Sequence, residues 1–461
     1  MEGPTGPSAA AGGGAAKPGL LDRLLRPFTD VEPGEAGTAL LMFLSLFLLL
    51  LGYYVLRTIR EPLILASGAE VKAYAAAGQA LTLMAFVPFY GWFASKVPRF
   101  GLILGFVLLF VACIELFSLA GHAGLPYVGI VYYIWVGIFS LATIAQFWSF
   151  ANDVYSREAG ERLFPFIFLG ATLGAPVGAK LAETLFERGV GPYDMMHVTT
   201  GLLLLHLGLY WVVARRVAGR PGQAAAAAPL ATSSGFGLVL QSRYLRLLAV
   251  LIVVLNLVNS LGNYIVDRSV TEAAKAAVAA DPSLSMDAFY GAFYGRFSFT
   301  FSTLGLLLQA FAVSRIVKYL GMAGALLALP FVALGAYGLI AAGASLAVIR
   351  WGKIAENATD YSVMNTARQL VWLPLSREEK YTAKQAVDTF FVRLGDLLQA
   401  AVVFGGTTWL ALGARGFAVV NVLLVGLWLA VAFGLLRQYG KVMRQRVEAA
   451  AGGAPEPSGG G

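Results

Sequence analysis

The sequence alternates long apolar segments with short polar ones along most of its length. A helix that crosses the hydrocarbon core of a bilayer needs about 20 mainly apolar residues. Segments of this length recur along the chain, and we predict membrane spans at residues 38–58, 75–95, 101–121, 126–149, 163–186, 195–214, 244–266, 292–314, 321–343, 345–366, 385–406 and 417–436. The pattern therefore predicts an all-α membrane protein of about twelve transmembrane helices.

The composition agrees with this interpretation. Of the 461 residues 58% are hydrophobic and only 13% are charged, too few to cover soluble domains of this total length. The single cysteine, Cys113, leaves no disulfide to form within the chain. His122, His197 and His206 lack the spacing of metal ligands, so we expect neither a metal nor a cofactor. The sequence also has no phosphate-binding GxxxxGK[ST] loop, and we do not expect an enzyme.

A polar segment rich in Gly, Pro and Ser divides the chain in two. We interpret residues 215–243 as a cytoplasmic linker between six-helix halves at residues 29–214 and 244–440. Residues 1–28 are interpreted as a disordered tail that ends in a short amphipathic stretch, and residues 441–461 as a second disordered tail. Two six-helix halves around a linker resemble the arrangement of major facilitator transporters.

The basic residues predict the orientation of the chain. With the N-terminus in the cytoplasm, 22 of the 34 Lys and Arg residues lie on the cytoplasmic side and 8 on the opposite side. Cytoplasmic loops of membrane proteins carry such an excess, so we predict a multi-pass protein of a bacterial-type inner membrane with both termini cytoplasmic. These loops also account for the net charge of +8. We therefore expect the lipid bilayer as a partner, no nucleic acid and no required oligomer.

Two predicted spans carry several charged residues each. The span at 345–366 contains Lys353, Glu356 and Asp360, and the antiparallel span at 385–406 contains Arg393 and Asp396. A charge at the bilayer centre costs about 2.5–3.5 kcal/mol on insertion scales, so such groups face a protein interior or a hydrated cavity. We predict that these five residues line a substrate-binding site. A rise of about 1.5 Å per residue places both sets at similar depth, and we hypothesise the ion pairs Glu356–Arg393 and Lys353–Asp396.

Three further polar residues belong to this predicted site. Asn259 and Asn263 share one face of the span at 244–266, and Arg60 follows the first span. Amides hydrogen-bond a solute or a neighbouring helix, and an arginine at this position either attracts an anion or reaches out to the membrane interface. Both interpretations are open for all three residues.

Carboxylates within the spans are candidates for proton coupling. Glu356 and Asp360 qualify if they face a hydrated path, with a static salt-bridge network as the alternative. Glu115 is a lone carboxylate in the middle of the span at 101–121. It either exchanges protons or satisfies a packing contact between helices.

The span at 163–186 contains a glycine face. Gly170, Gly174 and Gly178 recur every four residues, with Pro176 between the last two, so the three glycines lie on one side of a helix. A neighbouring backbone can approach such a face closely. We predict either plain helix packing or a pliable seam about which the halves rock, as in the similar glycine-proline motif of facilitator exchangers.

Several motifs resemble those of one transporter family. They are LRTIREPL at residues 56–63, FWSFAND at 147–153, KYTAKQAVD at 380–388 and RLG at 393–395. With them, residues 29–440 are similar to the ATP/ADP (nucleotide) translocases of plastids and intracellular bacteria. They are more similar to the free-living bacterial relatives of those translocases within the major facilitator superfamily. The resemblance implies the facilitator fold and transport.

The resemblance also points to four intramembrane positions on which nucleotide exchange depends in the translocases. Arg60 keeps the positive charge of a lysine in the first span, whereas Val136 and Asn263 stand in place of glutamates and Asp396 in place of a lysine. We therefore expect a secondary transporter that exchanges an anionic solute by alternating access, with ATP/ADP or another phosphorylated metabolite as its substrate. Proton-coupled transport of a different small solute and a non-transporting membrane scaffold or sensor are the alternatives.

Overall fold

The computed structural model describes residues 20–25, 29–94, 99–217, 235–376, 379 and 383–451. Regular structure in these ranges is helical throughout, which confirms the predicted all-α class. The first half contains α1 (Leu20–Leu25), α2 (Ala36–Leu65), α3 (Ala69–Ala94), α4 (Arg99–His122), α5 (Val128–Val154), α6 (Arg157–Glu187) and α7 (Pro192–Val217). The second contains α8 (Gly235–Gln241), α9 (Arg243–Ala280), α10 (Met286–Leu307), α11 (Val313–Ala341), α12 (Leu346–Thr359), α13 (Asn365–Leu370), α14 (Lys384–Ala386), α15 (Val392–Thr408) and α16 (Ala414–Ala451).

Each predicted span coincides with a helix or a helical series. By length and composition, 8 helical segments of the described residues are apolar enough to cross a membrane, and one of them, Met286–Ala341, contains two predicted spans. The three remaining predicted spans correspond to α3, to the series from α12 to α13 and to the series from α14 to α15. Charged residues such as Lys353 and Glu356 of α12 lower the mean hydropathy of these segments. Their side chains are buried in the protein interior and do not face the lipid.

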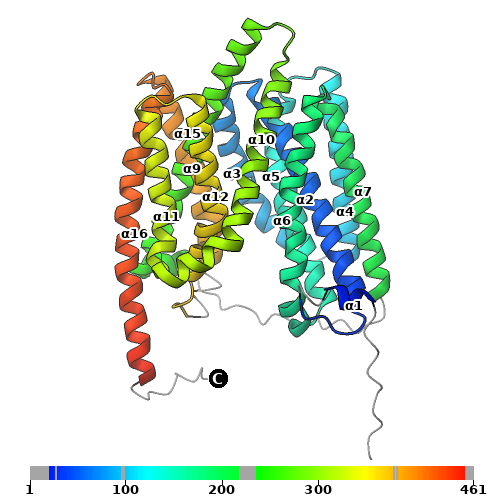
Figure 1. Cartoon of the computed structure of the whole chain (residues 1–461), viewed down its shortest axis with the longest axis vertical. Helices are drawn as coiled ribbons and strands as arrows, with labels where there is room; N and C mark the ends of the chain where they lie inside the picture. Colours follow the sequence, from blue (N-terminus) through cyan, green and yellow to red (C-terminus); the bar gives the residue numbers. More distant parts are fainter. Residues whose placement is uncertain are drawn as a thin grey trace, which may run out of the picture.

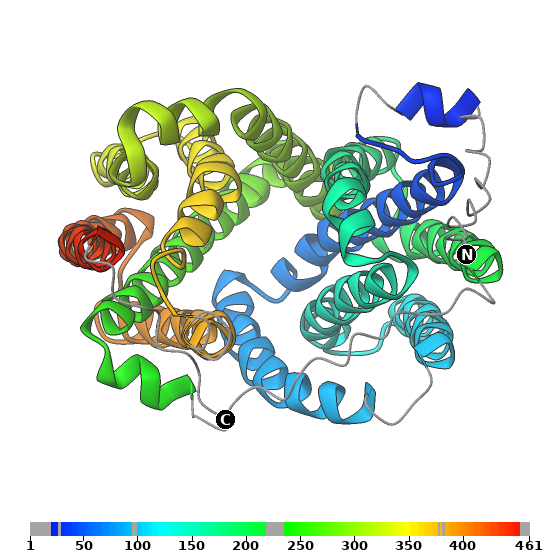
Figure 2. The same ribbon diagram turned by 90° about the horizontal axis from the view of Figure 1, so that it is seen from below.

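The helices form two groups that lie side by side. Within the first group α2 packs on α6 and α7, and within the second α9 packs on α15 and α16. The groups meet where α10 contacts α6 and α2 and where α15 contacts α3 (Figure 2). Helix α1 and the end of α16 lie at the same end of the bundle (Figure 1), as an even number of spans requires. We call this the terminal end, and the other the far end.

The predicted linker and tails are only partly described. Of the linker, α7 continues to Val217 and α8 occupies Gly235–Gln241, while the residues between lie outside the described ranges. Helix α16 continues to Ala451, so the prediction of disorder from residue 441 is wrong for residues 441–451. Ala, Arg, Gln, Glu and Lys predominate there, and all are good helix formers. Most of the predicted N-terminal tail and residues 452–461 lie outside the described ranges.

Several helices extend beyond the predicted spans, among them α2, α3 and α9. Helix α2 runs to Leu65 and α3 begins at Ala69, so Arg60 and Lys72 lie within helices and not in a polar loop. Helix α9 continues to Ala280. The added turns carry charged residues that pair across helices, and charge-assisted hydrogen bonds of this kind let the polar segments remain helical inside the bundle.

The glycine face of α6 packs directly on α2. A Cβ atom at Gly170, Gly174 or Gly178 would lie 2.4, 2.5 or 2.3 Å from a backbone oxygen of α2. No larger side chain fits at these distances without a shift of the backbone, so the glycines set the separation of the two helices. Pro176 lies inside α6, and the helix continues through it to Glu187. A hinge role for this seam stays a prediction.

Single-turn π-helical segments interrupt the helices of the second half. They are η1 (Leu308–Ala312), η2 (Asp360–Met364) and η4 (Val387–Phe391). In the first half, residues 29–94 and 99–217 contain no such segment. A π turn widens the helix and changes the direction of its side chains, and such turns are frequent at functional sites.

Candidate functional site

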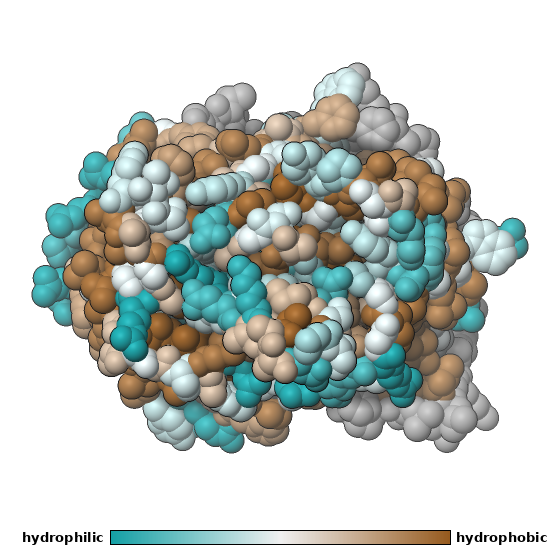
Figure 3. Space-filling view, turned by 90° about the horizontal axis from the view of Figure 1, so that it is seen from above, coloured by the Kyte–Doolittle hydropathy of each residue, from teal (hydrophilic) through white to brown (hydrophobic). Residues whose placement is uncertain are grey.

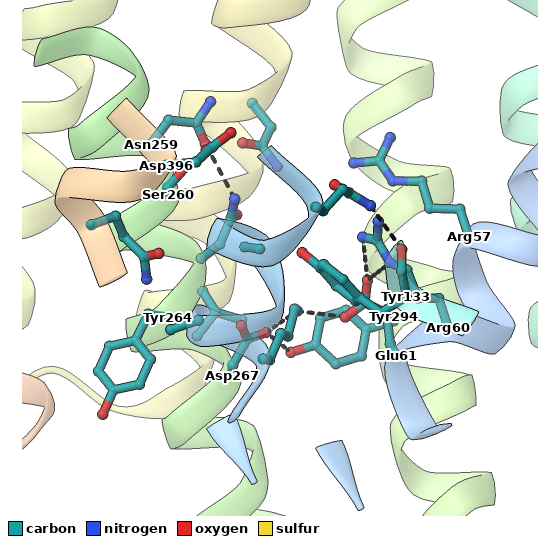
Figure 4. Close-up of a pocket in the computed structure, with 18 of the residues that line it drawn as sticks. Arg57, Arg60, Glu61, Tyr133, Asn259, Ser260, Tyr264, Asp267, Tyr294 and Asp396 are labelled. Atoms are coloured by element: carbon teal, nitrogen blue, oxygen red, sulfur yellow. Dashed lines mark hydrogen bonds and ion pairs between the residues drawn. The ribbon is translucent and has the colours of Figure 1, made fainter. Parts of the chain in front are cut away.

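A polar cavity of about 300 Å³ lies between the two halves (Figure 4). This volume lies at the lower end of the range for small-molecule sites in proteins. Helices α2, α3 and α5 line it from the first half, and α9, α10, α12, η2 and α15 line it from the second. Its charged lining residues are Arg57, Arg60, Glu61, Lys72, Asp267, Arg393 and Asp396. Amide and aromatic side chains complete much of the lining: Gln79, Asn256, Asn259, Asn263, Asn357, Gln399, Tyr133, Tyr264, Tyr294, Phe297, Phe301 and Tyr361.

Arg60 reaches the cavity from the last turns of α2. Its Nη2 atom lies 2.7 Å from Oε1 of the adjacent Glu61. Its guanidinium carbon lies 4.5 Å from the centre of the Tyr133 ring of α5, a cation–π contact. The Arg60 charge is therefore shared between a carboxylate and an aromatic face.

Arg57 lies one turn earlier on α2 and has a different environment. Its guanidinium carbon is 5.4 Å from the ring centre of Tyr54 and 5.7 Å from that of Phe301 on α10. Its Nη1 atom lies 3.5 Å from the hydroxyl of Tyr361, a long hydrogen bond. Arg57 makes no ion pair with a carboxylate of the described ranges. The side chain is half-buried and points into the cavity (Figure 4).

Lys72 of α3 joins the two halves. Its Nζ atom lies 2.5 Å from Oε2 of Glu61 in the same half and 2.7 Å from Oδ1 of Asp267 on α9. The hydroxyl of Tyr294 on α10 donates to the same Asp267 oxygen at 2.5 Å. All four side chains are buried, and low local polarity strengthens such a network.

Further contacts join the halves at the far end of the bundle. Arg296 of α10 lies 3.0 Å from Glu183 and 2.8 Å from Glu187, both on α6. Tyr264 of α9 donates to Glu70 of α3 at 2.9 Å. Figure 3 looks onto this end and shows hydrophilic side chains spread across it. Within the described ranges, the ion pairs that join one half to the other lie at this end.

Asp396 of α15 lies across the cavity from Arg57 (Figure 4). Its Oδ1 atom accepts hydrogen bonds from Asn256 and Ser260 of α9, each at 2.9 Å. Its Oδ2 atom lies 3.6 Å from Arg393, one turn earlier on α15. This carboxylate is firmly held on one oxygen and loosely paired on the other.

Lys353 and Glu356 of α12 form a buried layer behind the cavity. Lys353 Nζ lies 3.0 Å from Glu356 Oε1 and donates to the backbone and side-chain oxygens of Asn259 at 2.9 and 2.8 Å. The hydroxyl of Tyr337 on α11 donates to Glu356. Gly262 of α9 makes room for this contact, because a Cβ atom there would meet the Tyr337 hydroxyl at 1.8 Å. The two charged side chains are only 1% and 2% exposed.

The structure brings together five of the eight predicted site residues at the cavity wall: Arg60, Asn259, Asn263, Arg393 and Asp396. Lys353, Glu356 and Asp360 do not line it. Asp360 instead accepts from Asn259 at 3.2 Å and from Arg368 at 2.6 Å.

The two hypothesised ion pairs between spans are wrong. Lys353 pairs with Glu356 and Arg393 with Asp396, each three residues along its own helix. Neighbours at this spacing lie on one helix face, so each pair forms locally. Similar depth in the membrane does not bring the partners of the two hypothesised pairs together. Helix α9 contacts both α12 and α15, and its Asn259 and Asn256 bind Lys353 and Asp396 instead.

Glu115 lies away from the cavity, between α4 and α7. It accepts a hydrogen bond from Thr200 at 2.6 Å and lies 2.8 Å from Nδ1 of His197. The carboxylate is 38% exposed on this side of the bundle. These contacts give the residue a role in joining α4 to α7, and proton exchange by Glu115 stays a prediction.

Sequence reasoning missed several cavity residues: Glu61, Lys72, Asp267 and Tyr294. They lie near predicted span ends, where charged side chains usually reach out to the membrane interface. The sequence did contain a signal for them, because these span ends carry both positive and negative residues that could pair. Glu61, Lys72 and Asp267 carry opposite charges at the ends of spans that a bundle places side by side.

Comparisons with known proteins agree on the fold. No protein-family model matches the chain. The chain is 22% identical over 337 residues to "ADP,ATP carrier protein 1" of Chlamydia pneumoniae, which covers 62% of this chain. The match spans 62% of that protein's length.

Solved structures of transporters align over most of the chain. The nucleoside transporter NupG matches with a TM-score of 0.61 and 11% identity, over 87% of this chain and 99% of that one. A POT family transporter in complex with 5-aminolevulinic acid matches with a TM-score of 0.61 and 13% identity, over 88% and 96%. A bacterial homologue of the iron transporter ferroportin matches with a TM-score of 0.59 and 14% identity, over 87% and 98%. The chain is therefore an all-helical, multi-pass membrane protein with the two-halved fold of the major facilitator transporters.

Proposed function

We propose that the protein is a secondary transporter that moves a small anionic solute across the membrane by alternating access. The observation that carries this proposal is the polar cavity between the two halves, at which Arg57 presents a positive charge without a carboxylate partner in the described ranges. In major facilitator transporters the substrate site lies between the halves near the bilayer midplane, and the halves rock about it.

The contacts between the halves support a closed far end. The Lys72–Asp267 and Arg296–Glu183 ion pairs tie α3 to α9 and α10 to α6 at that end. A transporter that works by alternating access must break such contacts to expose the cavity on the other side. We propose that the structure represents the state closed at the far end, and that the termini are cytoplasmic in an inner membrane. Labelling of engineered cysteines at residues 125 and 243 with a membrane-impermeant reagent tests the orientation.

The charges of the cavity support an anion as substrate. Four cations line it, Arg57, Arg60, Lys72 and Arg393, against three carboxylates, Glu61, Asp267 and Asp396. The excess of one positive charge attracts a negatively charged solute into a site of low dielectric. The relative from Chlamydia pneumoniae is named for ADP and ATP, so nucleotides are the first phosphorylated anions to test here.

Flux into proteoliposomes tests the proposal. Purified protein is reconstituted with a mixture of unlabelled anions inside, and the uptake of labelled ATP, ADP, sugar phosphates and carboxylates is measured without an imposed ion gradient. We expect saturable uptake of at least one anion, stimulated by the same anion inside and reduced at least tenfold by Arg57→Gln. If no anion moves, either by exchange or in an imposed pH gradient, the transport proposal fails and the scaffold alternative gains.

Coupling to protons is the second candidate mechanism, and Asp396 favours it. This cavity carboxylate has one oxygen without a close hydrogen bond from the described residues, so a proton has access to it. Glu356 and Asp360, which the sequence suggested for this role, lie behind the cavity wall. A pH gradient that drives uptake in the wild type and in Glu356→Gln but not in Asp396→Asn would identify Asp396 as the coupling group.

A further inference from the structure

The charged residues of the cavity differ in how far they are already paired. Lys72 is held by two carboxylates at 2.5 and 2.7 Å, and Arg60 by Glu61 at 2.7 Å. Arg393 is 3.6 Å from Asp396. Only Arg57, among the described lining cations, has no carboxylate within ion-pair distance. A bound anion therefore finds one unneutralised positive charge.

Lys353 cannot supply a second one. The side chain is 1% exposed, and its ammonium group already has Glu356 and two oxygens of Asn259 as partners. Turning it into the cavity would leave Glu356 buried without its cation, which is strongly unfavourable. Lys353 is thus a fixed residue behind the cavity wall and is not available to bind the substrate.

The rest of the cavity offers neutral polar groups. Asn263 is exposed there, and Asn357 and Gln399 line it with no hydrogen bond to another described side chain. Tyr361 is 50% exposed next to Arg57. Amides and a phenol bind hydroxyl, carbonyl or amide groups of a solute, and they add no charge.

We propose that the substrate is a compact anion with a single carboxylate or phosphate group, which Arg57 binds, and with neutral polar groups that face Asn263, Asn357 and Gln399. This inference rests on the anion transport proposed above and narrows its substrate class. A nucleoside triphosphate carries three to four negative charges, and only one of them finds an unpaired cation here. Its other charges meet only cations that Glu61, Asp267 and Asp396 already pair with, so they stay unneutralised at low dielectric. The volume of about 300 Å³ also favours a small solute.

Binding to the purified full-length protein in detergent tests the inference. The probes are lactate, glycerol 3-phosphate and ribose 5-phosphate as compact anions, glycerol and ribose as their neutral counterparts, and ATP as the polyanion. Thermal shift identifies ligands and isothermal titration gives Kd values. We expect at least one compact anion to bind at least roughly tenfold more tightly than ATP, and neither neutral compound to bind measurably.

Variants connect this selectivity with Arg57. Arg57→Gln is expected to weaken binding of the compact anion at least tenfold, and Arg57→Lys to weaken it less, because the charge remains but the planar fork of donors is lost. Arg415→Gln, an exposed arginine outside the cavity, serves as the matched control and should bind like the wild type. Retained binding by Arg57→Lys shows that position 57 tolerates substitution without loss of the fold.

Three results would overturn the inference: ATP that binds as tightly as the compact anions, compact anions that fail to bind, or Arg57→Gln with unchanged affinity. If ATP binds tightly and is exchanged by proteoliposomes, the inference fails while anion transport stands. If no anion of the series binds or is transported, both fail.

Discussion

Lys72 and Asp267 hold the two halves together through an ion pair of 2.7 Å. Each partner has a second contact within its own half, Lys72 with Glu61 and Asp267 with Tyr294. If the halves separate at this end as proposed above, the lysine keeps one carboxylate and the aspartate keeps one hydroxyl donor. Neither charge is left alone in the interior, which lowers the free energy needed to open this end of the molecule.

Removing the lysine alone should destabilise the protein. Lys72→Met leaves Asp267 buried without a cation, and the loss of one partner of a buried pair typically costs about 3–5 kcal/mol. Asp267→Asn in the same chain removes that stranded charge. We expect Lys72→Met to lower the melting temperature clearly and the double variant to recover part of it, as measured by thermal unfolding in detergent. If the stability lost in the double variant equals the sum of the losses from its two substitutions, the pair is not energetically coupled.

The buried pair of α12 should behave as a structural element. Lys353→Met is expected to destabilise the fold by about 3–5 kcal/mol, because Glu356 then lies unpaired at 2% exposure. Lys353→Met combined with Glu356→Gln should be more stable than Lys353→Met alone, since glutamine still accepts the hydroxyl of Tyr337. Unfolding curves of the three variants measure this coupling. A double variant less stable than both single ones would contradict it.

Neutralising Asp396 should change how strongly the cavity prefers one anion over another of different charge. Asparagine at this position keeps an oxygen for Asn256 and Ser260, so the local hydrogen bonds survive. The excess positive charge of the cavity rises by one. Ribose 5-phosphate is mainly a dianion at neutral pH, because the second pKa of a phosphate monoester is about 6. We expect Asp396→Asn to bind it several times more tightly relative to lactate than the wild type does, and titration calorimetry measures the ratio. An unchanged ratio would mean that Asp396 does not act on the bound charge.

The glycine seam should tolerate no side chain. In Gly174→Ala the new Cβ atom would lie 2.5 Å from a backbone oxygen of α2, and such overpacking typically costs about 1–3 kcal/mol. Gly208→Ala is the matched control in α7, because nothing lies within 4 Å of its Cβ position. There alanine should stabilise the helix by up to about 1 kcal/mol. Opposite signs of the two melting-temperature shifts are expected, and a neutral Gly174→Ala would contradict a tight seam.

The long apolar segments were sufficient to predict the helices, because a span of about 20 apolar residues has few alternatives in a membrane. The positions of Arg60, Asn263 and Arg393 at the cavity also followed from their place near or within spans. Buried polar residues of this kind need a protein environment, and in a two-halved bundle the central interface supplies one.

The pairing of the charges did not follow from the sequence. Depth along a helix axis is readable from residue counting, but the direction in which a side chain points depends on the rotation of each helix against its neighbours. Lys353 turned toward α9 and the backbone oxygen of Asn259, a partner that no sequence pattern marks. Lys72 and Asp267 were assigned to loops, because α3 and α9 extend past the predicted span ends.

The π-helical turns η1, η2 and η4 all belong to the second half, whereas the close backbone contact of α6 with α2 belongs to the first. Helices kink readily at π turns, whereas the glycines of α6 leave little free space between this helix and α2. We therefore expect the second half to deform more readily than the first. In the transport cycle proposed above, we expect the deformation to concentrate in the second half, in the turns that contain Asp360 and Asp388.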